Sequence, residues 1–557
     1  MLLSGSDILV KTLIEQGCDT VFGYPGGQIL NVYDSLYTHQ NEITHILTAH
    51  EQGAAHAADG YARTTGRVGV VISTSGPGAT NLVTGIATAY LDSIPMVAIC
   101  GNVPTTQIGS DSFQEIDITG VTLPITKHNY FVGSVDRLAD TIREAFSLAM
   151  SGRPGPVLVD VPKDVQIAKC EYEPKTPARA EVPHAAKEIR IEEAARHIND
   201  AQRPYIYFGG GLIAAHAQEE MLALAEKIDA PLGCSLMGLS AVPTNHPRFL
   251  GMQGMHGHYA SSMAMHHADL ILSLGVRFND RVTGNRQKFA TAAKIVHIDV
   301  DGSELCKTVH AVCGLRGDVK QTLQKLLPLL HADKKTEWNE KVRIFREKEA
   351  AYTDNRTGLT PRNAILTLNK HLGENTAVAT DVGQHQMWSA QHLALKTPRR
   401  FISSGGLGTM GFGLGAAIGA AFGTKERSVL VTGDGSFGMC LQELATAVSY
   451  RIPLVILIMN NGVLGMVRQW QTLFYNKHYS NTVLNRKTDF AALARAFGAN
   501  GETVFDLEEL DNAFTRAFAE DGPYIVDCRI DKDEFVLPML PPGGSMDDII
   551  TSLEAKR

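Results

Sequence analysis

One short loop and an asparagine pair further along the chain constrain the fold more than any other feature. The loop is Gly433-Asp434-Gly435-Ser436, and Asn461 of Asn460-Asn461 follows 27 residues after Asp434. Apolar runs at 428–432 and 454–459 precede the two halves and predict buried strands, with a helix over 439–450 between them. A strand–helix–strand unit of this length places its two strands parallel in one sheet.

This unit is predicted to bring Asp434 and Asn461 to neighbouring strand ends, at the edge where open α/β sheets bind ligands. One carboxylate and one amide oxygen suit Mg²⁺, which phosphate oxygens commonly help to hold. The glycines let backbone N–H groups approach a diphosphate. The Gly-Asp-Gly loop alone, or the Asn-Asn pair alone, is typical of a turn or loop. Found together, with a strand before each, they predict a magnesium–diphosphate site.

Composition and charge exclude several classes of protein. A hydrophobic fraction of 44% and a net charge of −8 describe a globular protein without a basic face, so we expect no nucleic-acid partner. The eight cysteines show no CxxC spacing and are interpreted as reduced core residues. No run of 18 apolar residues and no signal or transit pattern is visible. We therefore expect no membrane partner and a cytoplasmic location.

The chain divides into three blocks of alternating strands and helices, which predicts an α/β protein with three parallel-sheet domains. A Pro/Ala-rich linker over 172–187 and a charged segment over 331–358, interpreted as a solvated helix and connection, separate them. The predicted domains are 1–170, 188–332 and 360–540, followed by a tail, 541–557. Blocks one and three are predicted to be structural repeats. The predicted strands are 20–23, 43–49, 68–74, 96–100 and 157–161; 204–208, 270–274 and 295–299; 377–380, 428–432, 454–459 and 524–527.

The magnesium–diphosphate pattern resembles the thiamin-diphosphate-binding motif, and thiamin chemistry needs one further acid. The cofactor reacts through a C2 carbanion that forms when its own 4′-imino group removes the C2 proton. That tautomer requires a carboxylic acid hydrogen-bonded to N1′ of the pyrimidine. Glu51 fits, because it follows strand 43–49 and opens a small-residue helix to Arg63. A lone Glu at a helix start is otherwise explained by the helix dipole.

Nearly the whole chain resembles the catalytic subunit of the acetohydroxyacid synthase (acetolactate synthase) family. The matching stretches are 22–28 (FGYPGGQ), 50–55 (HEQGAA), 74–81 (TSGPGATN), 112–115 (SFQE), 152–156 (GRPGP), 162–165 (PKDV), 254–257 (GMHG), 276–284 (VRFNDRVTG), 381–388 (DVGQHQMW), 405–411 (GGLGTMG) and 466–470 (MVRQW).

The resemblance implies roles for the thiamin-site residues. Glu51 would activate the cofactor through N1′, and Asp434, Asn461 and the backbone carbonyl near Val463 would bind Mg²⁺. Met410 would hold thiamin in its bent conformation. The remaining residues implied at this site are Gly26, Gly27, Pro77, Gln384, His385, Gly433, Gly435, Ser436 and Met466.

The family's reaction implies the substrates. Pyruvate is decarboxylated on thiamin diphosphate, and the hydroxyethyl carbanion is transferred to pyruvate or 2-ketobutyrate, giving 2-acetolactate or 2-aceto-2-hydroxybutyrate, the first common step of branched-chain amino-acid biosynthesis. Arg281, held beside Asp280, would bind the carboxylate of the acceptor. Trp470 would contact the extra methyl group of 2-ketobutyrate, a contact that discriminates by about 1–3 kcal/mol. The residues that would complete the pocket are Phe113, Gln114, Lys163 and Met255.

The middle block resembles the family's Rossmann-like FAD-binding domain. Because the reaction involves no net oxidation, the flavin would be structural. The matching positions are Arg153, Gly209, Gly210, Gly211, Met255, His256, Gly257, Gly275, Arg277, Asp280, Asp299 and Asp318. No GxGxxG fingerprint supports this independently, and the histidines at 256, 258, 266 and 267 match no zinc template. The chain departs from the family pattern at Asn279, where many members carry Asp, and at Gly415, where Pro is common.

Glu51 and Asp434 lie in different predicted domains, so one bound cofactor must contact both domains. In this family the two domains belong to two different chains, which implies a homodimer or tetramer. A small regulatory subunit is a possible further partner. The segment 466–479 and the tail after 541 would close over the site.

Three alternative functions share part of this pattern. A pyruvate oxidase shares the folds and the Glu, but Arg281 and Trp470 argue against it. A flavin-free catabolic acetolactate synthase is disfavoured by the stretches 276–284 and 466–470. A non-catalytic nucleotide-binding protein would have no need of Glu51 together with the magnesium pair.

Overall fold

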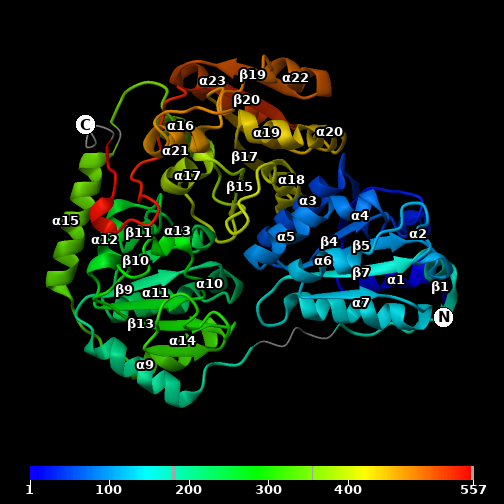
Figure 1. Cartoon of the computed structure of the whole chain (residues 1–557), viewed down its shortest axis with the longest axis horizontal. Helices are drawn as coiled ribbons and strands as arrows, with labels where there is room; N and C mark the ends of the chain where they lie inside the picture. Colours follow the sequence, from blue (N-terminus) through cyan, green and yellow to red (C-terminus); the bar gives the residue numbers. More distant parts are fainter. Residues whose placement is uncertain (178–182, 354, 553–557) are drawn as a thin grey trace.

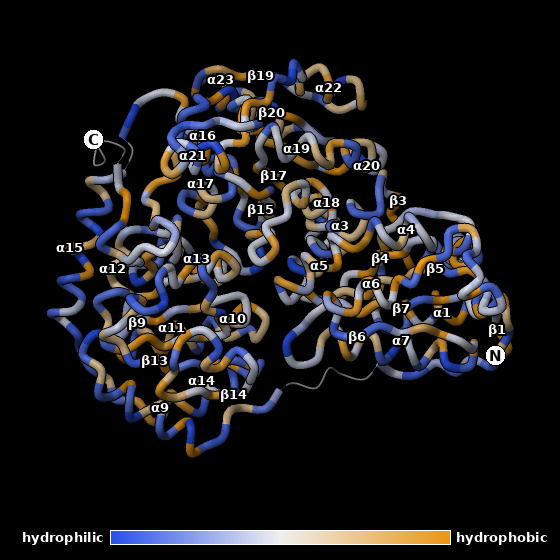
Figure 2. Tube along the Cα trace, viewed as in Figure 1, coloured by the Kyte–Doolittle hydropathy of each residue, from blue (hydrophilic) through white to orange (hydrophobic). Residues whose placement is uncertain are grey.

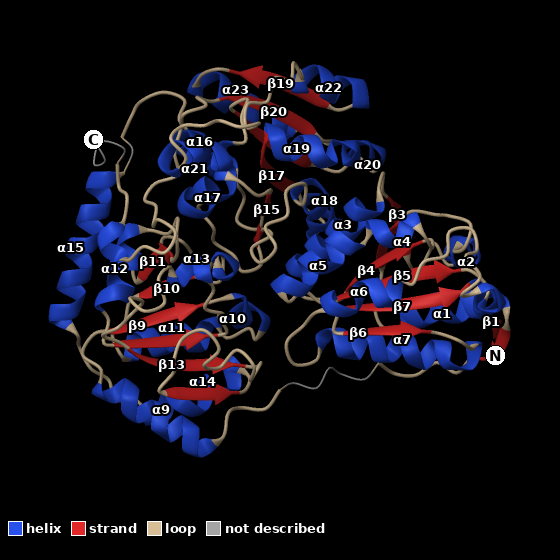
Figure 3. Ribbon diagram, viewed as in Figure 1, coloured by secondary structure: helices blue, strands red, loops and turns tan. Residues whose placement is uncertain are grey.

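The computed structural model describes residues 1–177, 183–353 and 355–552. Within these ranges the strands form three six-stranded sheets, all parallel, and one two-stranded antiparallel sheet. Each large sheet is covered by helices, and the three blocks lie around a common centre (Figures 1 and 3). This confirms the predicted fold class.

The first and third sheets have the same strand order. The first is β3-β2-β4-β5-β7-β6 and the third is β16-β15-β17-β18-β20-β19. Blocks one and three therefore repeat one topology, as predicted. In each sheet the direction in which successive strands are added changes between the first and the third strand along the chain. Ligand sites are therefore expected at the carboxyl ends of β2 and β4 in one block and of β15 and β17 in the other.

The elements of the first block are β1 (Leu2–Ser4), α1 (Gly5–Glu15), β2 (Thr20–Gly23), α2 (Leu30–Thr38), β3 (Thr44–Leu47), α3 (Glu51–Thr65), β4 (Gly69–Ser73), α4 (Pro77–Asn81), α5 (Val83–Asp92), β5 (Met96–Asn102), α6 (Ile118–Thr122), β6 (His128–Phe131), α7 (Val135–Met150), β7 (Pro156–Pro162), α8 (Lys163–Ile167) and β8 (Lys169–Glu171).

Those of the third block are α16 (Pro361–His371), β15 (Ala377–Thr380), α17 (Gln384–His392), β16 (Phe401–Ile402), α18 (Gly413–Thr424), β17 (Ser428–Gly433), α19 (Asp434–Cys440), α20 (Leu444–Ser449), β18 (Leu454–Asn460), α21 (Gly465–Phe474), α22 (Phe490–Phe497), β19 (Asn500–Val504), α23 (Leu507–Ala519) and β20 (Tyr524–Arg529).

The middle sheet has the order β11-β10-β9-β12-β13-β14, which is the Rossmann order. Its switch point lies between β9 and β12, where Gly209 and Gly275 follow the two strands. The elements are α9 (Glu188–Asp200), β9 (Pro204–Phe208), α10 (Gly210–Ala214), α11 (Gln218–Lys227), β10 (Leu232–Cys234), β11 (Phe249–Met252), α12 (Tyr259–His267), β12 (Leu270–Leu274), α13 (Asp280–Thr283), β13 (Lys294–Asp299), β14 (Cys313–Arg316), α14 (Val319–Leu326) and α15 (Thr336–Tyr352).

Blocks one and three meet through α3 and α18, whose backbones touch. A Cβ atom at Gly60 would lie 2.1 Å from the carbonyl oxygen of Ala416, and one at Gly419 would lie 1.8 Å from that of Ala57. Gly415, one of the departures from the family pattern, belongs to the same contact. Only glycine permits the two helices to approach this closely. Their close contact fixes the first block to the third.

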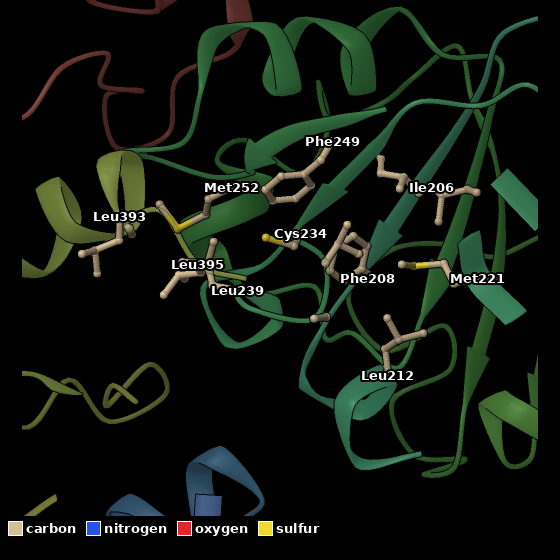
Figure 4. Close-up of a cluster of buried hydrophobic side chains, with 14 of the residues drawn as sticks. Ile206, Phe208, Leu212, Met221, Cys234, Leu239, Phe249, Met252, Leu393 and Leu395 are labelled. Atoms are coloured by element: carbon tan, nitrogen blue, oxygen red, sulfur yellow. The ribbon is translucent and has the colours of Figure 1, made fainter. Parts of the chain in front are cut away.

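The middle and third blocks share a hydrophobic core. Leu393 and Leu395, which follow α17, lie beside Met252, Leu239 and Cys234 of the middle block (Figure 4). Figure 2 shows the apolar residues gathered on the sheets of all three blocks. Fully burying one such leucine stabilises the fold by about 1.5–3 kcal/mol.

Several details differ from the predictions. The predicted helix over 439–450 is confirmed only for its second half, α20, because α19 already begins at Asp434 and the chain makes a 3₁₀ turn between the two helices. In the charged segment, α15 is solvated on one face only, since Trp338, Val342 and Phe345 are buried.

The predicted domain limits stay predictions. Residues 178–182 of the predicted linker and 553–557 of the predicted tail lie outside the described residues. Among the described helices, none has both the length and the apolar character required to cross a bilayer.

Candidate active site

A cavity of about 1200 Å³ lies where the three blocks meet. The third block contributes the carboxyl ends of β15, β17 and β18, the middle block its switch point, and the first block the end of α5. The predicted residues that line the cavity are Arg153, Gly210, Gly211, Met255, His256, Gly275, Arg277, Asp280, Arg281, Asp299, Asp318, Gln384, His385, Met410, Gly433, Asp434, Gly435, Ser436, Asn461, Val463, Met466 and Trp470.

The predicted metal pair occupies neighbouring strand ends. Gly433 of β17 pairs with Met459 of β18, so Asp434 and Asn461 follow adjacent strands. Burial raises the pKa of the Asp434 carboxyl to about 6, although the N–H groups of Gly435 and Gly462 donate to it. The other asparagine has a different role, because Asn460 Nδ2 donates to Asp527 Oδ1 (2.8 Å) and ties β18 to β20.

Two buried polar atoms beside this pair lack a partner among the described residues. They are Ser436 Oγ and His385 Nε2, and both residues line the cavity. Buried polar atoms are normally hydrogen-bonded, so the Ser436 hydroxyl suits an oxygen of a diphosphate. Burial lowers the pKa of His385 to about 3, so the ring is neutral. Because its N–H already donates to the Asp381 backbone, Nε2 is an acceptor and suits a hydrogen-bond donor.

The donor set suits a magnesium diphosphate better than a bare metal ion. In the described part of the chain, no group of three or more His, Cys, Asp or Glu side chains could hold a metal. A cation beside Asp434 and Asn461 therefore needs backbone and phosphate oxygens to complete its coordination.

The switch point forms the other part of the cavity. Gly211 packs so closely on Gly275 that a Cβ atom would lie 2.7 Å from the Gly275 Cα. Burial raises the pKa of the Asp299 carboxyl to about 6. Gln253 Oε1 and His256 Nδ1 are buried without a partner among the described residues. Close-approaching glycines and a carboxyl for ribose hydroxyls fit a dinucleotide such as FAD.

Glu51 belongs to a second group of predicted residues, on the first block. Glu51 Oε2 accepts a hydrogen bond from Asn81 Nδ2 (3.0 Å), and Lys163 Nζ donates to the Gly27 carbonyl (3.2 Å). Gly76 touches Gln114, and the neighbouring Phe113 is 83% exposed. The predicted residues outside the cavity lining, all of them described, are Glu51, Gly26, Gly27, Pro77, Phe113, Gln114, Lys163, Gly209 and Gly257.

The three blocks match the three domains of one enzyme family. The thiamine pyrophosphate enzyme N-terminal binding domain matches residues 3–121, the central domain 191–326, and the C-terminal binding domain 381–528.

Full-length relatives narrow the family further. The chain is 44% identical to the probable acetolactate synthase large subunit of Methanocaldococcus jannaschii, over 100% of this chain and 96% of the relative. It is 44% identical to the acetolactate synthase isozyme 2 large subunit of Escherichia coli K12, over 99% and 100%, and 44% identical to the acetolactate synthase large subunit of Corynebacterium glutamicum, over 98% and 90%. The chain belongs to the acetolactate synthase large-subunit family.

Family membership sets two alternatives aside. The full-length relatives are acetolactate synthase subunits, so neither an oxidase nor a non-catalytic nucleotide-binding protein is supported. The chain is an enzyme of this type, and thiamin diphosphate is its cofactor.

Sequence reasoning missed residues that hold the predicted ones in place. Gln384 Nε2 donates to Gln469 Oε1 (3.0 Å) and to the Glu534 carbonyl (2.7 Å), which fixes Gln384 against α21. Asn81 holds Glu51, and Thr74 packs on Gly26. Thr74 and Asn81 stand in the quoted stretch 74–81, so that motif could have identified both.

Proposed function

We propose that this chain, with thiamin diphosphate, Mg²⁺ and FAD, condenses pyruvate with a second pyruvate or with 2-ketobutyrate. One observation carries the proposal. Arg281 and Trp470 line the same cavity as Asp434, Asn461 and Ser436, so a cation and an aromatic face stand beside the magnesium–diphosphate edge.

Thiamin diphosphate, when bound, would supply the nucleophilic carbon needed to decarboxylate one pyruvate and to transfer its two-carbon unit. Asp434, Asn461 and the backbone carbonyl near Val463 would hold the Mg²⁺, while Ser436 would donate to the diphosphate and His385 would lie beside it. Gly433, Gly435 and Gln384 shape this edge, and Met410 and Met466 support the thiamin. Glu51 keeps a proton at pyrimidine N1′, with Gly26, Gly27 and Pro77 around it.

Arg281 orients the acceptor by its carboxylate, because a guanidinium matches a carboxylate with two parallel hydrogen bonds. Trp470 offers an apolar face to the acceptor's side chain. The pocket is completed by Met255 of the same chain and by Phe113, Gln114 and Lys163 of a second copy.

FAD binds at the switch point as a structural cofactor. The cavity continues from the diphosphate edge to Gly210, Gly211 and Gly275, where orphaned polar atoms of Gln253 and His256 support a polar ligand. The residues proposed to hold it are Arg153, Gly209, Gly210, Gly211, Met255, His256, Gly257, Gly275, Arg277, Asp280, Asp299 and Asp318.

A second copy of the chain completes the site. Glu51 lies apart from the cavity that Asp434 lines, on a sheet edge where Tyr24, Leu47 and Phe113 are exposed. Leu407 and Val467 are exposed beside the cavity. Burying these apolar side chains between two copies would bring the Glu51 of each to the cavity of the other, in a homodimer or a tetramer. The words "large subunit" in the relatives' names support a small regulatory partner. The proposed location is the cytoplasm.

Product analysis tests the function. The purified chain is incubated with pyruvate, thiamin diphosphate, Mg²⁺ and FAD while oxygen uptake is recorded, and 2-ketobutyrate is then added. We expect acetolactate without oxygen-coupled turnover, and 2-aceto-2-hydroxybutyrate after the addition. Acetate or acetyl phosphate with stoichiometric oxygen uptake would replace the proposal with an oxidase.

A further inference from the structure

A buried ion cluster links the first block to the loop 403–412 of the third block. Arg63 of α3 donates through Nη2 to Asp92 Oδ2 (2.9 Å) at the end of α5, and through Nε to Asp59 Oδ1. The side chains of both acids are 0% exposed. Such groups hold their positions, since moving one would leave a buried charge unpaired.

Asp92 and Arg63 hold the backbone of this loop. Asp92 accepts hydrogen bonds from the N–H groups of Gly405 (3.0 Å) and Gly406 (2.7 Å). Arg63 Nη1 donates to the Ser403 carbonyl (2.8 Å), and its guanidinium lies 5.3 Å from the centre of the Phe412 ring. Between these anchors the loop forms a wall of the cavity and carries Met410.

The same end of α5 contacts the flavin part of the cavity. Arg277 Nη2 donates to the Leu91 carbonyl (2.5 Å), and Arg153 Nε donates to Ser93 Oγ (2.8 Å). Both arginines line the cavity. Three successive residues, Leu91, Asp92 and Ser93, therefore contact the walls of both cofactor sites.

We propose that Asp92 is a positioning residue that sets the loop 403–412 for thiamin diphosphate and couples its binding to that of FAD. The coupling rests on the proposed flavin site. A flavin seated against Arg153 and Arg277 fixes Leu91 and Ser93, and with them Asp92 and the loop. Thiamin diphosphate then binds to a wall that is already ordered, and the reverse effect must be equal.

The test is a pair of titrations on the full-length protein freed of cofactors. The Kd of thiamin diphosphate at saturating Mg²⁺ is measured by calorimetry, without and with saturating FAD. For the unaltered chain we expect FAD to tighten binding at least about fivefold, the lower end of typical couplings. In Asp92→Asn, one amide oxygen cannot accept from two N–H groups and Arg63, so thiamin diphosphate binds more weakly. The ratio of its Kd without FAD to its Kd with FAD then falls towards one.

Asp59→Asn is the matched control, because it removes the same charge from Arg63 without touching the loop. It should keep the ratio of the unaltered chain. The proposal is overturned if that ratio is one, if Asp92→Asn retains it, or if Asp59→Asn loses it equally.

Two further measurements keep the outcomes separable. FAD binding is followed by visible absorbance. If the chain binds no flavin, both the proposed flavin site and the coupling are wrong, and thiamin diphosphate binding is still measured separately. If Asp92→Asn does not fold, Asp92→Glu replaces it, since it keeps the negative charge beside Arg63 but moves the carboxylate away from the N–H groups of Gly405 and Gly406. An unchanged ratio in that variant would overturn the proposal.

Discussion

The guanidinium carbon of Arg281 lies 5.9 Å from the centre of the Trp470 ring. Arg281 also pairs with Asp280 at 3.6 Å, but both side chains are more than half exposed, so solvent screens that pair. A cation on an aromatic face keeps its N–H groups free for a planar anion. One arrangement therefore offers a carboxylate partner and an apolar wall to the same acceptor.

Replacing Trp470 with Leu should lower the preference for 2-ketobutyrate over pyruvate as acceptor by roughly 10-fold, because one methyl contact discriminates by about 1–3 kcal/mol. The ratio of the two products formed from mixed ketoacids measures this. Phe474→Leu is the control. It removes the neighbouring ring, 5.6 Å from Trp470, and should leave the ratio within about twofold. An unchanged ratio in Trp470→Leu would remove Trp470 from acceptor choice.

Replacing Arg281 with Lys should raise the KM for the acceptor at least about 10-fold, since a point charge cannot reproduce the bidentate contact. Release of CO₂ from the first pyruvate should change little, because that step precedes acceptor binding. Arg343→Lys is the control, because its exposed pair with Glu340 on α15 contributes only about 0–1 kcal/mol, and it should leave both quantities near those of the unaltered chain. Equal losses in the two steps would show that Arg281 serves the cofactor rather than the acceptor.

The prediction of the fold succeeded where strands are buried on both faces. Segments such as 454–459 form continuous apolar runs because helices cover a parallel sheet on both sides. Missed strands lack that signal. β10 has three residues, one of them glycine, and β19 is a polar edge strand. An edge strand is defined by its pairing partner more than by its own pattern.

The prediction of the site succeeded where function follows from strand adjacency, as at Asp434 and Asn461. Asp92 gave no signal, because its partner Gly405 is 313 residues away and the end of a helix looks ordinary in sequence. The separation of Glu51 from the cavity was implied only by the family resemblance, since the residues alone do not show how α3 packs against α18.

If two chains share each site, two inactive variants should complement each other. Glu51→Gln removes the acid on one side and Asp434→Asn the metal ligand on the other. Each alone should lose at least about 100-fold in activity. Mixed and allowed to exchange subunits, they form dimers with one intact site, and about a quarter of the unaltered activity should return. Activity of the mixed sample is the measurement, and the fraction of mixed dimers, followed with a different affinity tag on each variant, calibrates exchange. No recovery despite exchange would place Glu51 and Asp434 in one chain's site.

The raised pKa of Asp434 predicts a conflict between stability and function. Its carboxyl has a pKa of about 6 in the folded protein, above the ordinary value of 3.8. The folded state therefore binds the proton more tightly than the unfolded state does. The stability contributed by the neutral carboxyl is fully present below about pH 4 and is lost as pH rises through about 6, at a cost of roughly 2–4 kcal/mol.

Asp434→Asn should accordingly unfold at a higher temperature than the unaltered chain at pH 7.5, when both are free of cofactors, and at about the same temperature near pH 4. It should no longer bind Mg²⁺ with thiamin diphosphate, and in the unaltered chain that binding should weaken below about pH 6, because protonation removes the ligand. Asp506→Asn is the control, since Asp506 is an exposed cap of α23 and Asn caps a helix equally well. If Asp434→Asn is less stable at pH 7.5, the buried carboxylate is already compensated within the fold, and holding the metal carries no cost in stability.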